Sequence, residues 1–92
     1  DTLISLCSPA HEFQTRRNAA EALKRLNVLD PDLFVYLLEA KCSFNTRLSG
    51  PIDTVLKYYL DNTEGRRFVE SVYRASSWTD REKSILEPMF KR

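Results

Sequence analysis

Apolar residues recur along most of this chain at the three- and four-residue spacing of an α-helix. One stripe joins Ala19, Ala22, Leu23 and Leu26, and the opposite positions carry charged side chains. Such a stripe is typical of an amphipathic helix that buries one face. Other segments share the spacing, so the sequence predicts six helices. We place them at about residues 1–6, 15–26, 31–40, 49–60, 66–76 and 79–90.

Capping residues and prolines predict where four of these helices begin. A short polar side chain satisfies the first free amides, and proline is tolerated in the first turn. Residues 62–65 separate the fourth helix from the fifth, and Pro88 is expected to kink or fray the last helix. The four start signals are Thr15, Asp30 before Pro31, Ser49 before Gly50-Pro51, and a capping box of Thr79 and Glu82.

The third predicted helix is apolar on almost every side between Leu33 and Ala40. A helix without a polar face belongs between neighbouring elements, so we expect it at the centre of the fold. A strand over 33–38 is the alternative, but the helical composition of residues 39–41 favours the helix. The predicted core comprises Leu23, Phe34, Leu37, Leu38, Val55, Leu56, Tyr59 and Phe68.

A short motif recurs before the second helix of each predicted pair, with an aromatic residue followed three positions later by arginine. The three aromatics are 31 and 34 residues apart. A period of this length with two helices per unit is typical of α-helical repeats. We therefore predict an all-α fold, a short HEAT-like right-handed α-solenoid of about six helices, with an ordinary six-helix bundle as the alternative. The units are about 1–31, 32–65 and 66–92, and the motif residues are Phe13 with Arg16, Phe44 with Arg47, and Trp78 with Arg81.

These motif residues are expected to have structural roles at the turns. The aromatic ring would fill the open end between the two helices of its own pair. An arginine in the first turn of a helix opposes the helix dipole, which indicates a tertiary partner. We expect that partner to be the carbonyl groups that end the preceding helix, or a carboxylate such as Glu39 or Glu70. Solvated arginines without a role are the alternative.

Composition and charge exclude several classes of partner. The 14 basic and 13 acidic residues are mixed along the chain and give a net charge of +1. This balance provides no long-range field for nucleic acid or for an acidic membrane. No apolar run approaches the ~18 residues that span a bilayer. We expect neither nucleic acid nor membrane as a partner.

No catalytic motif is recognisable in the sequence. His11-Glu12 begins the zinc-protease signature, but Thr15 stands where the second histidine is required, and the chain has one histidine. Cys7 and Cys42 are expected to be buried reduced thiols, with a disulfide between them as the alternative. No paired cysteine spacing supports a zinc site that includes them. We therefore expect no catalytic, cofactor-binding or metal-binding residue in this chain.

Residues 17–27 (RNAAEALKRLN) and 45–51 (NTRLSGP) resemble the C-terminal helical region of bacterial-type M1-family zinc aminopeptidases. The resemblance covers most of the chain and implies paired antiparallel helices of HEAT or armadillo kind. The family's zinc-binding helix and substrate-recognition loop have no counterpart here, so no catalytic residue carries over. Zinc and the metallopeptidase activity would belong to the parent protein.

The resemblance implies that the chain is a non-catalytic cap domain that closes the active-site chamber of such an aminopeptidase. Because the chain begins at Asp1, we expect it to be part of a longer polypeptide, whose remainder would be its partner. The alternative function is a stand-alone α-helical scaffold that binds a protein or peptide along its concave face.

Overall fold

Polar side chains fix the start of several helices in the computed structural model, which describes residues 2–90. Oδ1 of Asp30 accepts hydrogen bonds from the backbone amides of Asp32 and Leu33 at 2.9 and 3.2 Å. The capping box is also confirmed. The amide of Thr79 donates to Oε1 of Glu82 at 2.9 Å, and the amide of Glu82 donates to Oγ1 of Thr79 at 3.2 Å.

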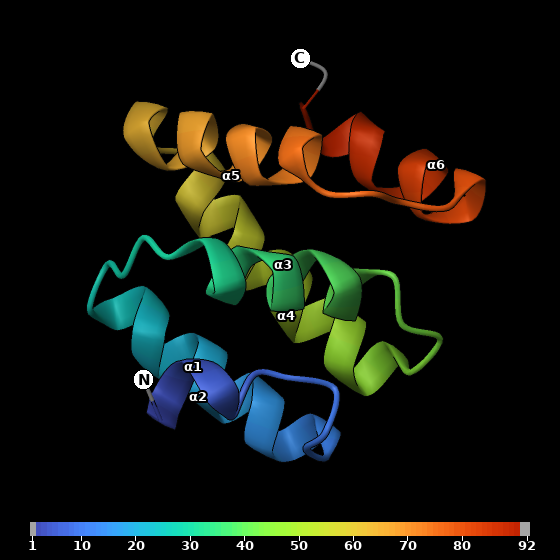
Figure 1. The fold of residues 1–92 in the computed structure, drawn as a ribbon. Helices are drawn as coiled ribbons and strands as arrows, with labels where there is room; N and C mark the ends of the chain where they lie inside the picture. The colour runs from blue at the N-terminus through green and yellow to red at the C-terminus, as the bar shows by residue number, and fades with distance from the viewer. Residues whose placement is uncertain (1, 91–92) are drawn as a thin grey trace.

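Six α-helices make up the structure, and residues 2–90 contain no β-strand. The predicted all-α class is confirmed. The Asp1 end of the first predicted helix lies outside the described residues. The helices, labelled in Figure 1, are α1 (Thr2–Ser5), α2 (Phe13–Arg25), α3 (Pro31–Lys41), α4 (Thr46–Leu60), α5 (Thr63–Ala75) and α6 (Asp80–Phe90).

Three predicted helix starts are wrong, and in each case the helix begins earlier. α5 begins at Thr63, within the predicted break at residues 62–65, because Oδ1 of Asn62 caps it by accepting from the amide of Gly65 at 3.1 Å. Thr15 lies inside α2, whose N-cap residue is Glu12 without a side-chain cap. Ser49 lies inside α4, because Asn45 supplies a cap one turn before it: Oδ1 of Asn45 accepts from the amide of Arg47 at 3.0 Å. Pro51 is consequently an interior residue of α4 rather than a first-turn residue.

The helices form three tiers in Figure 1, with α1 and α2 at the bottom, α3 in the middle and α5 and α6 at the top. α4 runs obliquely behind α3, from the lower right to the start of α5. α3 packs against α1, α4, α5 and α6. α4 packs against α2, α3 and α5, and α1 packs against α2. The Cα atoms occupy 30 × 27 × 20 Å. None of the described helices is long and apolar enough to cross a membrane.

α3 occupies the centre of the core, as its composition predicts. Its residues Leu33, Phe34 and Leu38 are fully buried. The ring of Phe34 meets the edge of Tyr59 at 4.8 Å between centroids, and it meets Phe68 of α5 at 5.4 Å. These ring contacts join α3, α4 and α5. Phe68 itself is half-buried at the edge of the core, whereas the other predicted core residues are buried: Leu23, Phe34, Leu37, Leu38, Val55, Leu56 and Tyr59.

The corner between α4 and α5 depends on a glycine. A Cβ atom on Gly65 would collide with the backbone carbonyl of Tyr59, so only glycine lets the two helices approach this closely. Gly50 differs, because a Cβ atom there would meet nothing within 4 Å. Gly65 is therefore required by close packing at the corner, whereas Gly50 meets only its own chain neighbours, which include Pro51.

Candidate functional site

The predicted arginine at the start of α2 has the tertiary partners that its position required. Arg16 is 6% exposed, and its Nε donates to the carbonyl of Cys7 at 2.9 Å, just beyond the end of α1. Its Nη2 lies 3.3 Å from Oε2 of Glu39 on α3. Both predicted partner types, a carbonyl at the preceding helix end and Glu39, are confirmed for this arginine. Arg16 thereby ties the first helix pair to α3.

The predicted arginine at the start of α6 reaches a different helix from the one expected. Nη2 of Arg81 donates to the carbonyl of Cys42 at 2.8 Å, and Cys42 is the C-cap of α3 rather than a residue at the end of α5. The guanidinium also lies over the ring of Phe44, 4.0 Å from its centroid. The structure therefore brings together two predicted residues from different motif copies.

The middle arginine departs from the prediction. Arg47 is exposed, and among residues 2–90 its side chain has no hydrogen-bond or ion-pair partner. The expectation that it bonds the end of α3 is wrong. Arg81 already occupies the Cys42 carbonyl at that helix end. Arg47 remains a solvated cation in the first turn of α4.

The three motif aromatics occupy different environments. Phe13 packs against the core while partly exposed. Trp78 stacks on Tyr73 at 6.0 Å and donates its Nε1 hydrogen bond to the Tyr73 carbonyl at 2.9 Å, which seals the α5–α6 connection. Phe44 is 86% exposed, so the prediction that it fills the space between its two helices is wrong. The Arg81 guanidinium lies over one face of this exposed ring.

The two cysteines are buried free thiols, as expected, and no disulfide joins them. Burial raises the pKa of Cys7 to about 11, although the charge of Arg16 lowers it in part. Burial also raises the pKa of Cys42. Both groups are therefore neutral and weakly nucleophilic at pH 7. Within residues 2–90, no group of three or more His, Cys, Asp or Glu side chains is arranged to hold a metal ion.

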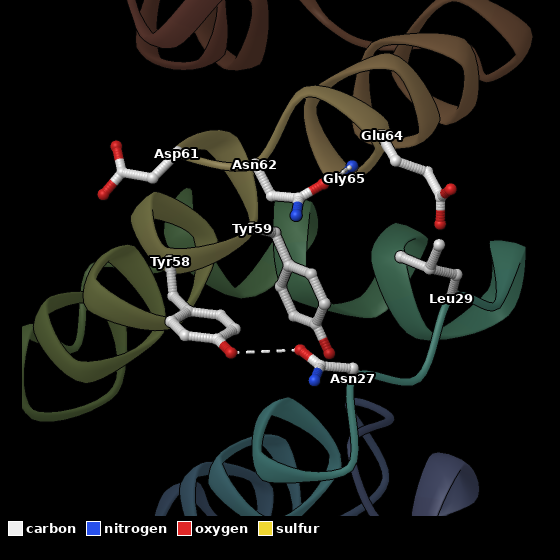
Figure 2. Close-up of a pocket in the computed structure, with 8 residues that line it drawn as sticks. All are labelled: Asn27, Leu29, Tyr58, Tyr59, Asp61, Asn62, Glu64 and Gly65. Carbon is white, nitrogen blue, oxygen red and sulfur yellow. Dashed lines mark hydrogen bonds between the residues drawn. The ribbon is translucent and has the colours of Figure 1, made fainter.

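A pocket that the sequence did not predict lies where the α2–α3 connection meets the α4–α5 corner, and we call it the corner pocket (Figure 2). It is an open cavity of about 580 Å³. Asn27 and Leu29 line it from the α2–α3 connection, and Tyr58 and Tyr59 line it from the end of α4. The remaining wall is the turn into α5.

Hydrogen bonds fix the polar walls of the corner pocket. The Tyr58 hydroxyl donates to Oδ1 of Asn27 at 3.0 Å. Asn27 has φ = 54°, a left-handed conformation that asparagine adopts more readily than most residues. The Tyr59 hydroxyl donates to the carbonyl of Leu23 at 3.2 Å, and burial raises the pKa of Tyr59 to about 12. Oδ1 of Asn62 accepts from the amide of Gly65 at 3.1 Å.

The charged residues that line the corner pocket are both acidic, namely Asp61 and Glu64. Figure 2 shows the Glu64 carboxylate beside Leu29, on the side of the pocket away from the Tyr58 ring, whereas the Asp61 carboxylate points away from the other lining residues. At the rim, Nζ of Lys24 lies 5.3 Å from the centroid of the Tyr58 ring. The pocket therefore combines an aromatic wall, two amide side chains and negative charge.

Two sequence signals pointed to this pocket without identifying it. An asparagine directly after the last apolar residue of α2 is a common left-handed helix end. Tyr58 follows Lys57 on the polar side of the α4 stripe, where an aromatic ring has no core to enter. No protein-family model, curated protein or solved structure matches this chain.

Proposed function

We propose that this chain is a non-catalytic helical domain that packs against another protein surface through the exposed residues Phe44, Arg47 and Arg81. We call these three residues the turn surface. The observation that carries the proposal is the Phe44 ring, which is 86% exposed and has the Arg81 guanidinium over one face, 4.0 Å from its centroid.

An exposed aromatic ring beside a bonded arginine is well suited to an interface. Burying a phenylalanine side chain contributes roughly 1.5–3 kcal/mol. Arginine and aromatic residues are enriched among the residues that dominate binding energy. Because Arg81 already bonds the Cys42 carbonyl at 2.8 Å, less side-chain freedom remains to be lost on association. The Phe44–Arg81 contact is therefore partly ordered before association, and Arg47 is an exposed cation three residues after Phe44.

The non-catalytic part of the proposal is supported by the roles that buried and half-buried charges take. Arg16 pairs with Glu39 and joins α2 to α3. Nζ of Lys41 pairs with Oδ1 of Asp53 at 2.6 Å and joins α3 to α4. These charges hold helices together. We expect the isolated chain to show no zinc-dependent hydrolysis of aminoacyl nitroanilides, and such hydrolysis would contradict this part of the proposal.

A short HEAT-like right-handed α-solenoid is the architecture that we propose for the three tiers, and an ordinary six-helix bundle is the alternative, which the different environments of Phe13, Phe44 and Trp78 favour. The support for the solenoid is the packing of α1 on α3, of α2 on α4 and of α3 on α5, because successive units of a stack place equivalent helices side by side. The third pair also uses contacts of another kind, α4 with α5 and α3 with α6. The stack would therefore be least regular at its last unit.

The resemblance of residues 17–27 and 45–51 supports a specific form of this function. In that form the domain is the C-terminal cap of an M1-family zinc aminopeptidase, the turn surface packs on the peptidase's own chain, and zinc belongs to the catalytic part. A stand-alone scaffold that binds a separate protein or peptide is the second candidate. The exposed turn surface favours both, because either role needs an exposed contact surface.

A photo-crosslinking experiment distinguishes these roles. Benzoylphenylalanine would replace Phe44 in the protein expressed in its own cells, and a control would carry it at exposed Ser71 on α5. We expect adducts from position 44 in excess of those from position 71. Adduct peptides from a chain with an HExxH motif would support the peptidase cap, and peptides from one other protein would support the scaffold. Equal adducts from both positions, or none from position 44, would overturn the proposal.

A further inference from the structure

We propose that the corner pocket binds a lysine or arginine side chain of a partner polypeptide, at a place separate from the turn surface. This inference goes beyond the proposed function, because the corner pocket and the turn surface share no residue and each can be tested without the other. Its support comes from the shape of the cavity, the aromatic wall and the sign of the lining charges.

The corner pocket has the size and the walls of a side-chain receptor. Its volume of about 580 Å³ lies within the range of roughly 300–1,000 Å³ that is typical of ligand sites. Leu29 and the Tyr58 ring supply apolar surface against which the methylene groups of a long side chain can pack. The Tyr58–Asn27 hydrogen bond holds two opposing walls in place. A bound side chain would therefore enter a largely preformed site.

The aromatic wall already attracts a cation within the chain. Nζ of Lys24 lies 5.3 Å from the centroid of the Tyr58 ring, within the ≈ 6 Å reach of a cation–π interaction. A cationic ligand that displaced Lys24 from the Tyr58 ring would gain the same attraction. A neutral ligand would gain nothing from this feature of the site.

The lining charges select the same kind of ligand. Glu64 places its carboxylate beside Leu29 at the edge of the pocket, and among the described residues it takes part in no ion pair. Asp61 also lines the pocket, but its carboxylate points away from it. An anion would meet the Glu64 carboxylate, and the Gly65 amide at the start of α5 is already taken by Asn62 at 3.1 Å. The pocket is therefore complementary to a positive charge.

A titration of the full 92-residue chain tests this proposal by two-dimensional ¹H–¹⁵N NMR. The probes are N-acetyl-arginine-methylamide and N-acetyl-lysine-methylamide, and N-acetyl-citrulline-methylamide is the neutral control of nearly the same shape as the arginine probe. We expect the cationic probes to shift the amides of Asn27, Tyr59 and Gly65 with millimolar affinity. The citrulline probe should shift them far less.

Two matched variants locate the charge that matters. Glu64→Gln and Glu70→Gln remove one negative charge each from α5, but only Glu64 lines the pocket. We expect Glu64→Gln to weaken binding of the arginine probe by about fivefold, as for an exposed ion pair worth about 1 kcal/mol, and Glu70→Gln to leave it unchanged. Equal shifts with citrulline, equal effects of the two variants, or shifts elsewhere on the chain would overturn the proposal.

Discussion

Replacing the buried arginine of α2 tests most directly what holds the helix pairs together. Arg16→Ala removes the hydrogen bond to the Cys7 carbonyl at 2.9 Å, and a buried bond from a charged donor is worth about 1.5–3 kcal/mol. It also removes the ion pair with Glu39. The Glu39 side chain is 34% exposed, so solvent limits that pair to about 0.2–1 kcal/mol. The expected loss is therefore about 2–4 kcal/mol, a large share of the ~5–15 kcal/mol typical of a domain.

Urea unfolding followed by circular dichroism at 222 nm measures this loss. Arg47→Ala is the matched control, because Arg47 has the same place in its motif but an exposed side chain without a partner among residues 2–90. Its removal should leave the free energy of unfolding unchanged, or raise it by a few tenths of a kcal/mol, since a cation at a helix start opposes the dipole.

A double-mutant cycle with Glu39→Ala separates the ion pair from the carbonyl bond. The coupling energy should stay below about 1 kcal/mol, with most of the Arg16→Ala effect remaining in the Glu39→Ala background. If Arg16→Ala and Arg47→Ala cost the same, burial and partners do not distinguish the two arginines and the reasoning fails. A coupling energy equal to the whole effect would show that the Cys7 carbonyl bond contributes nothing.

Four further predictions concern the core, the glycines, acid stability and the thiol. Leu38→Ala should cost ~2–5 kcal/mol in urea unfolding because the side chain is fully buried in α3, and an unchanged midpoint would contradict its central position. Gly65→Ala should lower the unfolding temperature more than Gly50→Ala, because only at Gly65 would the new Cβ atom meet the backbone of another helix; equal shifts would contradict the steric difference. Burial raises the pKa of Asp53, but two lysine partners outweigh burial and hold that pKa below its ordinary value. Its stabilisation should therefore be present above about pH 4 and lost as the pH falls through the lower folded-state pKa, so Asp53→Asn should flatten the acid part of the stability curve measured by urea unfolding from pH 7 to 2. With the other cysteine replaced by serine, Cys7 should react with Ellman's reagent at pH 8 only as fast as the chain opens, because it is buried and its pKa is about 11; immediate labelling of the folded chain would contradict this.

Local signals in the sequence were sufficient for the class of the fold and for its centre. Asp30 before Pro31 starts α3 where predicted, because both the cap and the proline act on amides within one turn. The apolar run that follows is buried on several sides, since no polar face could be turned to solvent. These features depend on neighbours in the chain, so periodicity and capping chemistry identify them.

The predictions that were wrong concern residues whose role depends on a competing residue nearby or on a contact with a distant part of the chain. Serine is a favourable N-cap residue, so Ser49 is a reasonable prediction. Asn45, four residues earlier, caps the helix instead, and α4 therefore begins at Thr46. Arg47 and Arg81 have the same local motif, yet only Arg81 reaches the Cys42 carbonyl, 39 positions away in the chain. The corner pocket likewise exists only once the α2–α3 connection meets the end of α4. A local sequence pattern does not predict which of two similar arginines reaches the Cys42 carbonyl, because that depends on how the helices pack.

The stacking of Trp78 on Tyr73 gives the protein its own optical probe of one region. Trp78 is the single tryptophan, and it sits at the connection between α5 and α6. Its fluorescence therefore responds to the detachment of α6, whereas far-ultraviolet circular dichroism averages over all six helices. If the fluorescence and the circular dichroism change at the same denaturant concentration, α5 and α6 unfold cooperatively with the other four helices. A fluorescence change at lower denaturant would mark fraying from the carboxyl-terminal side, with the tiers below still folded.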